Sequence, residues 1–188
     1  MSHSNPSAPQ LTFLAISGSL RGMSSNATLL GAAARLAGAK VRVVFGAGIG
    51  DLPHFNPDLD GEGTEPPPAV ALFRAQIREA DAILISSPEY IHGVPGSLKN
   101  ALDWTASTGD FMGKPVALIN ASATSSHAQA ALLETLTVLM AEVTATRIPL
   151  RSNKIEIDDV LADDSTSQSL RQVIDSLVAL ISSRADRA

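Results

Sequence analysis

One stretch of the chain concentrates side chains that bind anions. Residues 18–26 read GSLRGMSSN and contain three serines and Arg21. The stretch lies between an apolar run of strand length and a run of helical composition. A helix N-terminus offers unpaired backbone N–H groups and a positive partial charge, and an arginine can make a bidentate contact with an oxyanion. The sequence therefore predicts a phosphate-binding loop, although a simpler interpretation remains open, in which Ser24 or Ser25 only caps the helix.

A second stretch is suited to holding a flat ring. Residues 87–104 read SPEYIHGVPGSLKNALDW, and their prolines and glycines predict a non-helical path that leaves backbone N–H and C=O groups pointing outward. Such a backbone edge can recognise a heterocycle with alternating donors and acceptors, for example the pyrimidine edge of a flavin. Tyr90, the only tyrosine in the chain, could stack on such a ring.

Each notable side chain of this second stretch also has a structural interpretation. Tyr90 could be a packing or interface residue, and Glu89 could order the loop rather than act as an acid. Lys99 and Asp103 have the spacing of an ion pair on a solvated helix face. Trp104 is better explained as a core or interface residue than as a ligand, whereas His92 is a candidate for contact with a substrate.

The elements that position these stretches alternate regularly along the chain. Apolar runs predict five strands, and helical spacing predicts five helices between and after them. This alternation indicates an α/β fold with a doubly wound, five-stranded parallel sheet of order 2-1-3-4-5 and helices on both faces. In such sheets ligands bind beyond the carboxyl ends of the strands. The predicted strands are 11–16, 41–45, 82–85, 116–120 and 143–148, and the predicted helices are 26–36, 70–80, 95–106, 128–139 and 170–181.

Composition narrows the possible partners and chemistry. The 188 residues carry a formal net charge of −5 with scattered basic residues, which disfavours nucleic acid as a partner. The chain has no cysteine, which removes disulfides and thiolate chemistry and favours a cytoplasmic location. No metal site and no membrane span is predicted. Residues 1–10 are interpreted as a flexible polar tail rather than a signal peptide, and residues 11–188 as a single domain.

The two stretches together resemble the NADPH-dependent FMN reductase family, which includes quinone- and chromate-reducing flavoproteins. The family motif GSxRxxSxN is matched within residues 18–26, and PEYN followed by PGxLKNAxDW is matched within residues 88–104 except at Ile91, where the family has Asn. The resemblance covers about residues 11 to 125. It implies bound FMN, NADPH or NADH as the electron donor, a flavodoxin-like fold, and a homodimer or homotetramer with the site at a subunit interface.

The resemblance also implies roles for individual residues. The FMN phosphate would be held by Ser19, Arg21, Ser24 and Asn26, with Ser25 beside them, and the isoalloxazine ring would be bordered by Pro88, Glu89 and Tyr90 and by the backbone of Ile91. Ser122 lies in the third loop, residues 120–125, which lacks the glycines frequent in the family. Ser122 and His92 are the candidate contacts for the substrate.

The expected activity follows from flavin chemistry rather than from a catalytic side chain. A nicotinamide nucleotide would give hydride to the flavin and leave. A small acceptor, such as a flavin, a quinone or chromate, would then take the electrons at the same place, which is a ping-pong route. A non-catalytic flavodoxin-like electron carrier is the main alternative, and a nucleotide-binding regulatory domain without flavin is a third.

Overall fold

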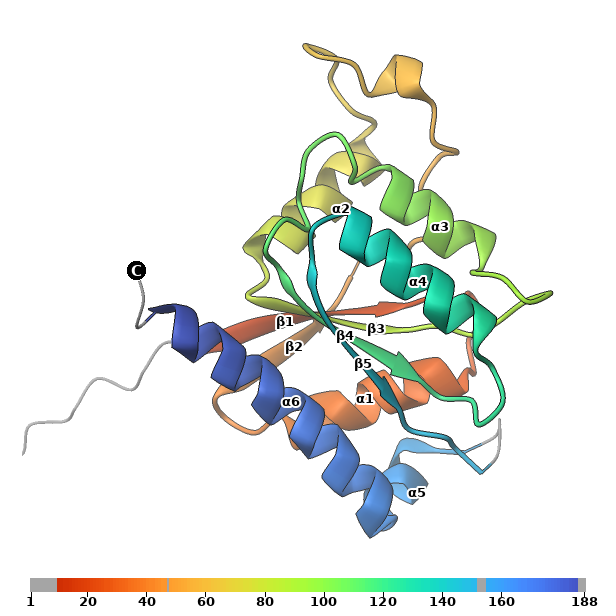
Figure 1. Cartoon of the computed structure of the whole chain (residues 1–188), viewed down its shortest axis with the longest axis vertical. Coiled ribbons are helices and arrows are strands. Elements are labelled where there is room, and N and C mark those ends of the chain that lie inside the picture. Colours follow the sequence, from red (N-terminus) through yellow and green to blue (C-terminus); the bar gives the residue numbers. More distant parts are fainter. Residues whose placement is uncertain (1–9, 47, 152–154, 186–188) are drawn as a thin grey trace, which may run out of the picture.

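The computed structural model describes residues 10–46, 48–151 and 155–185. Most of the predicted tail, residues 1–9, lies outside this part of the chain. A parallel five-stranded sheet of order β2-β1-β3-β4-β5 runs through the middle of the molecule, so the predicted topology is confirmed (Figure 1). The strands are β1 (Leu11–Ser17), β2 (Val41–Phe45), β3 (Ala82–Ser86), β4 (Pro115–Asn120) and β5 (Glu142–Arg147).

Strand composition follows position in the sheet. Every residue of β3 and β4 is buried, because both strands are covered on both faces, as strands of parallel sheets usually are. β5 is an edge strand, and four of its six residues are exposed. Because all five strands are parallel, the loops after β1, β3 and β4 lie at the same, carboxyl edge of the sheet.

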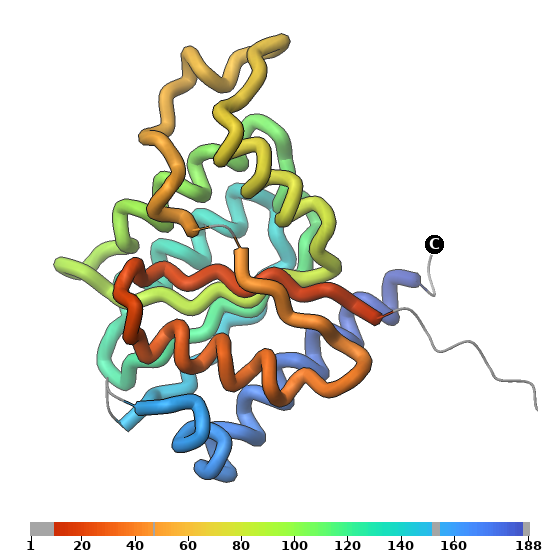
Figure 2. Tube along the Cα trace, turned by 180° about the vertical axis from the view of Figure 1, so that it is seen from behind, coloured from red at the N-terminus to blue at the C-terminus, as the bar shows by residue number. Residues whose placement is uncertain are grey.

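Helices cover the sheet on both faces. α2 (Pro68–Glu79), α3 (Gly96–Asp103) and α4 (His127–Val138) pack on one face, where Phe73 and Leu98 belong to the same core cluster as Leu14 of β1. α1 (Ser25–Leu36) and α6 (Asp164–Ala185) pack on the other face, where Leu29 and Leu170 join a second cluster (Figures 1 and 2). Among the described residues, no helix is long and apolar enough to span a bilayer.

The prediction of five helices is wrong, because the described residues form six α-helices and a short 3₁₀ helix. The unpredicted α-helix is α5 (Ile157–Ala162), and the 3₁₀ helix, η1 (Pro57–Leu59), interrupts the long loop after β2. Glu156 and Asp159 form a capping box at the start of α5. Ile157 packs on α1, where a Cβ at Gly31 would lie 2.6 Å from the Ile157 Cδ1.

Two helix boundaries also differ from their predicted positions. α3 ends at Asp103 rather than near Ala106, because the following residue, Trp104, turns into the core and is fully buried. α6 begins at Asp164, well before the first predicted residue. Asp163 accepts hydrogen bonds from Ser165 Oγ at 2.7 Å and from the Thr166 backbone N–H at 2.8 Å, and these bonds lower its pKa to about 2.

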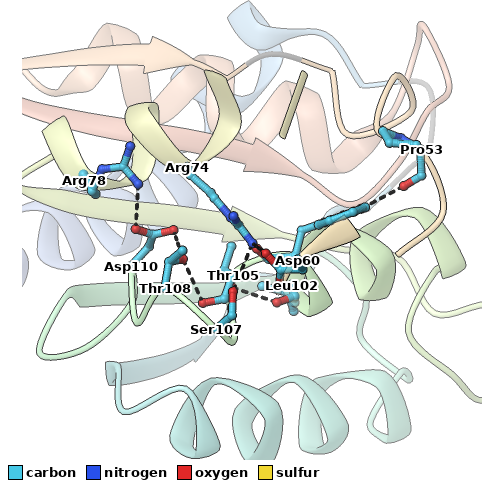
Figure 3. A network of polar contacts seen from close by, with 10 residues as sticks. Pro53, Asp60, Arg74, Arg78, Leu102, Thr105, Ser107, Thr108 and Asp110 are labelled. Atoms are coloured by element: carbon cyan, nitrogen blue, oxygen red, sulfur yellow. Dashed lines mark hydrogen bonds and ion pairs between the residues drawn. The ribbon is translucent and has the colours of Figure 1, made fainter. Parts of the chain in front are cut away.

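A buried polar network attaches the long loop after β2 to the helices beside it (Figure 3). Arg74 of α2 lies 2.6 Å from Asp60 of the loop, and its Nε donates to the Trp104 carbonyl oxygen at 2.6 Å. The indole N–H of Trp104 donates to the Pro53 carbonyl oxygen at 2.8 Å. Asn100 donates to the same carbonyl and accepts from the backbone N–H of Phe55, so the loop is held on α3 at several points.

Candidate functional site

The loops after β1 and β3 are in close contact at the carboxyl edge of the sheet. The backbone N–H of Gly18 donates to the Ser86 carbonyl oxygen at 2.8 Å. A Cβ at Gly18 would lie 2.4 Å from Ser87 Oγ, so only glycine fits between the two loops as they stand. The two stretches singled out by their composition are therefore brought together by the fold.

The predicted phosphate-binding loop presents several donors at the start of α1. Ser24 is the N-cap residue, and its side chain accepts from the Asn26 backbone N–H at 3.3 Å, so Ser24 does cap the helix. Within the described part of the chain, nothing accepts from the guanidinium of Arg21 or from the backbone N–H groups of Gly22 and Met23. A cavity of about 200 Å³ opens beside this loop and is lined by residues 22–24, 27–28 and 155–157. The cap thus leaves donors for an anion.

Asn26 and Ser19 have internal partners as well. Asn26 is buried, and its Oδ1 accepts from Ser86 Oγ of β3 at 2.9 Å, which fixes α1 against the central strand. The backbone N–H of Ser19 donates to Ser17 Oγ at 3.2 Å, and Ser19 Oγ accepts from the backbone N–H of Arg21 at 3.3 Å. These contacts order the loop around its exposed arginine. Ser25 is the first residue of α1 and is partly buried.

Residues 90–93 form a tight turn in the loop after β3. Tyr90 and Gly93 exchange two backbone hydrogen bonds, of 3.0 and 2.9 Å. Ile91 and His92, the two central residues, have φ values of 50° and 56°, which is the left-handed region expected of a type I′ turn. Asn adopts this conformation readily, whereas a β-branched residue adopts it only at an energetic cost. The backbone therefore accounts for the Asn of the family motif and makes Ile91 a strained substitute, whose side chain is fully exposed.

Replacing Ile91 by Asn is expected to stabilise the protein by about 1 kcal/mol, because it relieves left-handed backbone strain without removing a buried contact. Chemical denaturation of the two proteins measures the difference. Ile91→Val is the matched control, since valine keeps the β-branch and should leave stability unchanged. Equal stability of the Asn variant and the parent would show that the turn carries no strain at this position.

Glu89 links the loop after β3 to α4. Its Oε2 accepts from the backbone N–H of Ala128 at 2.9 Å, and Ser126, the N-cap residue of α4, makes no side-chain capping bond. The bond from Ala128 is the main reason why the pKa of Glu89 lies below its usual value. It outweighs burial, and His127 and His92 lower the pKa further. The structural interpretation of Glu89 as a residue that orders the loop is confirmed.

The loop after β4 is held by side chains rather than by glycines. Ser122 Oγ accepts from the backbone N–H groups of Thr124 and Ser125, at 3.2 and 3.1 Å. Asn120 donates to the Ser125 carbonyl oxygen at 2.8 Å. Arg147, at the end of β5, donates to the carbonyl oxygens of Ala123 and Ser125. The Ser122 hydroxyl is thus engaged within its own loop.

Sequence reasoning gave no role to two residues of this region, Arg147 and His127. The rings of His92 and His127 are stacked, with centroids 4.5 Å apart and an interplanar angle of 12°. Neither histidine matches a position of the family motifs, and no signal in the sequence pairs them.

The structural interpretations of Lys99 and Asp103 as an ion pair, at 2.5 Å, and of Trp104 as a core residue are confirmed. In the described part of the chain no group of three or more His, Asp or Glu could hold a metal ion.

Comparisons with known proteins agree on one family. A family model described as NADPH-dependent FMN reductase matches residues 11–154. An NAD(P)H-dependent FMN reductase from Pseudomonas aeruginosa is 36% identical over 172 residues, which are 87% of this chain and 91% of that protein. An NAD(P)H:quinone oxidoreductase from Solanum tuberosum is 33% identical and covers 92% of this chain and 93% of its own length.

Solved structures support the same relationship. FerB, a flavoenzyme NAD(P)H:(acceptor) oxidoreductase from Paracoccus denitrificans, superposes with a TM-score of 0.73 at 29% identity, covering 92% of this chain and 98% of that one. A flavodoxin from the domain Archaea superposes with a TM-score of 0.57 at 14% identity, covering 92% of this chain and 99% of that one. The second match shows that the predicted flavodoxin-like fold is correct.

Proposed function

The chain belongs to the NADPH-dependent FMN reductase family, and from this premise we propose that it is an NAD(P)H-dependent flavoenzyme that passes electrons through FMN to a small acceptor. The proposed acceptors are a flavin, a quinone, chromate or a similar small molecule. The proposed route is ping-pong, in which the nicotinamide product leaves before the acceptor binds. FMN, when bound, supplies the redox chemistry, so no side chain needs to act as a strong base.

One observation carries the proposal, namely the set of donors at the start of α1. The guanidinium of Arg21 and the backbone N–H groups of Gly22 and Met23 have no acceptor among the described residues. They precede the N-terminus of α1, and Gly22 and Met23 line a cavity of about 200 Å³. An FMN phosphate satisfies donors of this kind, and the positive end of the helix favours its charge. We assign the phosphate to Arg21 with Ser19, Ser24, Ser25 and the Nδ2 of Asn26.

The ring of FMN is assigned to the loop after β3. Pro88, Glu89, Tyr90 and the backbone of Ile91 would border it, in keeping with the contact between this loop and Gly18. Tyr90 is half-exposed and available for stacking. Backbone N–H groups held in fixed directions would stabilise negative charge on a bound ring system. His92 and Ser122 are proposed to lie on the side where the acceptor enters.

Reconstitution and reduction test the proposed function. The purified protein is mixed with FMN, freed of excess ligand and examined for a flavin spectrum, and NADPH or NADH is then added without oxygen in a stopped-flow instrument. Bleaching of the bound flavin, followed by recovery of its colour when a quinone is added, is the expected result. Bound FMN that neither nicotinamide bleaches would indicate an electron carrier. A protein that binds no FMN would contradict both the flavoenzyme and the electron carrier.

A homodimer or homotetramer in the cytoplasm is also proposed. Tyr90 is 49% exposed and Ile91 102% exposed, so the loop that would border the flavin presents apolar surface that a second copy could cover. Analytical ultracentrifugation of the protein with FMN measures the assembly. A monomer at micromolar concentration would contradict the proposed interface.

A further inference from the structure

The stacked pair of histidines connects two parts of the chain that the proposed function treats separately. His92 is a central residue of the turn at 90–93, and His127 is the first residue of α4. Both side chains are exposed, yet their rings lie nearly parallel with centroids 4.5 Å apart. Offset or parallel ring contacts of this kind stabilise the elements that carry them. The proposed function gives His127 no role.

The turn at 90–93 needs support from outside itself. Its own bonds are the two backbone hydrogen bonds between Tyr90 and Gly93. Ile91 and His92 both hold left-handed backbone conformations, which non-glycine residues adopt at a cost. Because the Ile91 side chain is fully exposed, it contributes no packing that would offset this cost. At the tip of the turn, the ring of His92 is in contact with the ring of His127.

A second contact joins the loop after β3 to α4, at the residue that follows His127. Glu89 precedes the turn and accepts from the backbone N–H of Ala128, which follows His127. The carboxylate of Glu89 and the ring of His92, three positions apart on the loop after β3, are therefore held to two adjacent residues of α4. Arg147 fixes the preceding loop through the Ala123 and Ser125 carbonyl oxygens, so the start of α4 is itself a firm support.

We propose that His127 is a positioning residue, whose ring stacks on His92 and holds the turn at 90–93 in the left-handed conformation that borders the flavin ring and the acceptor. We call this ring pair the histidine clasp. What the turn borders rests on the proposed function, whereas the clasp itself depends only on the protein. Because of its position, His127 would determine how tightly the acceptor is bound without touching the phosphate site.

Hydrogen exchange in the full-length protein without FMN tests the clasp directly. The protection of the Tyr90 and Gly93 amides is measured by NMR for the parent, His127→Ala and His127→Phe. The alanine variant should lose protection by roughly two- to tenfold, the factor that corresponds to one aromatic pair. The phenylalanine variant, which keeps a ring, should restore most of it. His54→Ala, which removes a histidine from another loop, should leave both amides unchanged.

The same variants separate the clasp from a general effect on folding. With FMN and NADPH present, His127→Ala should raise the KM for a quinone and leave the Kd for FMN nearly unchanged. An equal rise in both constants would overturn a positioning role on the acceptor side.

The results also distinguish this inference from the proposed function. A turn that loosens in His127→Ala, in a protein that binds no FMN, would support the clasp and contradict the flavoenzyme. A turn with unchanged protection in His127→Ala would overturn the clasp, even if FMN binds and NADPH bleaches it.

Discussion

Replacement of Arg21 by alanine is expected to weaken FMN binding by about 1.5–3 kcal/mol, which corresponds to a rise in Kd of roughly ten- to 150-fold. The reason is that a charge-assisted hydrogen bond to a phosphate is lost while the phosphate stays in place. Arg21 is exposed and its guanidinium has no partner among the described residues, so its removal should not disturb the fold. Quenching of FMN fluorescence on binding measures the Kd.

Riboflavin provides the sharpest control for the Arg21 experiment, because it has the same ring as FMN and no phosphate. Its Kd should be the same in the parent and in Arg21→Ala. Lys40→Ala removes one positive charge at the opposite, amino end of the sheet and should leave the Kd for FMN unchanged. If riboflavin and FMN lose affinity equally in Arg21→Ala, the arginine does not bind the phosphate.

Replacement of Arg74 by alanine is expected to lower the free energy of unfolding by about 3–5 kcal/mol. Arg74 and Asp60 are both buried, with 5% and 8% of their side chains exposed, and the truncation leaves the Asp60 carboxylate without its cation. It also removes the hydrogen bond from Arg74 to the Trp104 carbonyl oxygen. The cation–π contact is lost as well, in which the Arg74 guanidinium lies 5.9 Å from the centroid of the Trp104 ring. Urea unfolding followed by the fluorescence of Trp104, the only tryptophan, measures the loss.

A double variant shows whether the buried carboxylate is the cause. Asp60→Ala combined with Arg74→Ala should be more stable than Arg74→Ala alone, because the unpaired charge is gone. Arg35→Ala is the arginine control, because it breaks an ion pair at the surface. Its partner is Asp158, and the two side chains are 56% and 84% exposed, so a smaller loss is expected. A double variant that is less stable than Arg74→Ala would contradict the argument.

Acid should weaken the contribution of the Arg74–Asp60 ion pair to the free energy of unfolding. Burial acts to raise the pKa of Asp60, but hydrogen bonds from Arg74 and Ser107 outweigh it, and the pKa lies below its ordinary value. A carboxyl group with a lowered pKa in the folded state stabilises the protein fully above its ordinary pKa of about 3.9. The contribution is lost as the pH falls through the lowered value, so the difference in stability between Arg74→Ala and the parent should narrow in strong acid.

Local sequence determined the parts of the fold that depend on residues close together in the chain. Apolar runs and helical spacing predicted the five strands, their order and the loops at the carboxyl edge, since a parallel α/β sheet leaves few alternatives. α5 escaped prediction because its apolar face is short and gains its burial by packing on α1, at Gly31, and on α6. A six-residue helix is marginal without such a tertiary contact.

The same distinction applies to the candidate site. The sequence by itself determined which loops carry the candidate phosphate and ring contacts, because motif, glycine and proline positions are local signals. Only the tertiary structure decided what Glu89, His92 and Ile91 do there. Glu89 accepts a hydrogen bond from the backbone N–H of Ala128, 39 positions later, at the start of α4. His92 stacks on His127 of that same helix. Such contacts have no local signature, because residues far apart in the chain meet only when the sheet has formed and its loops converge.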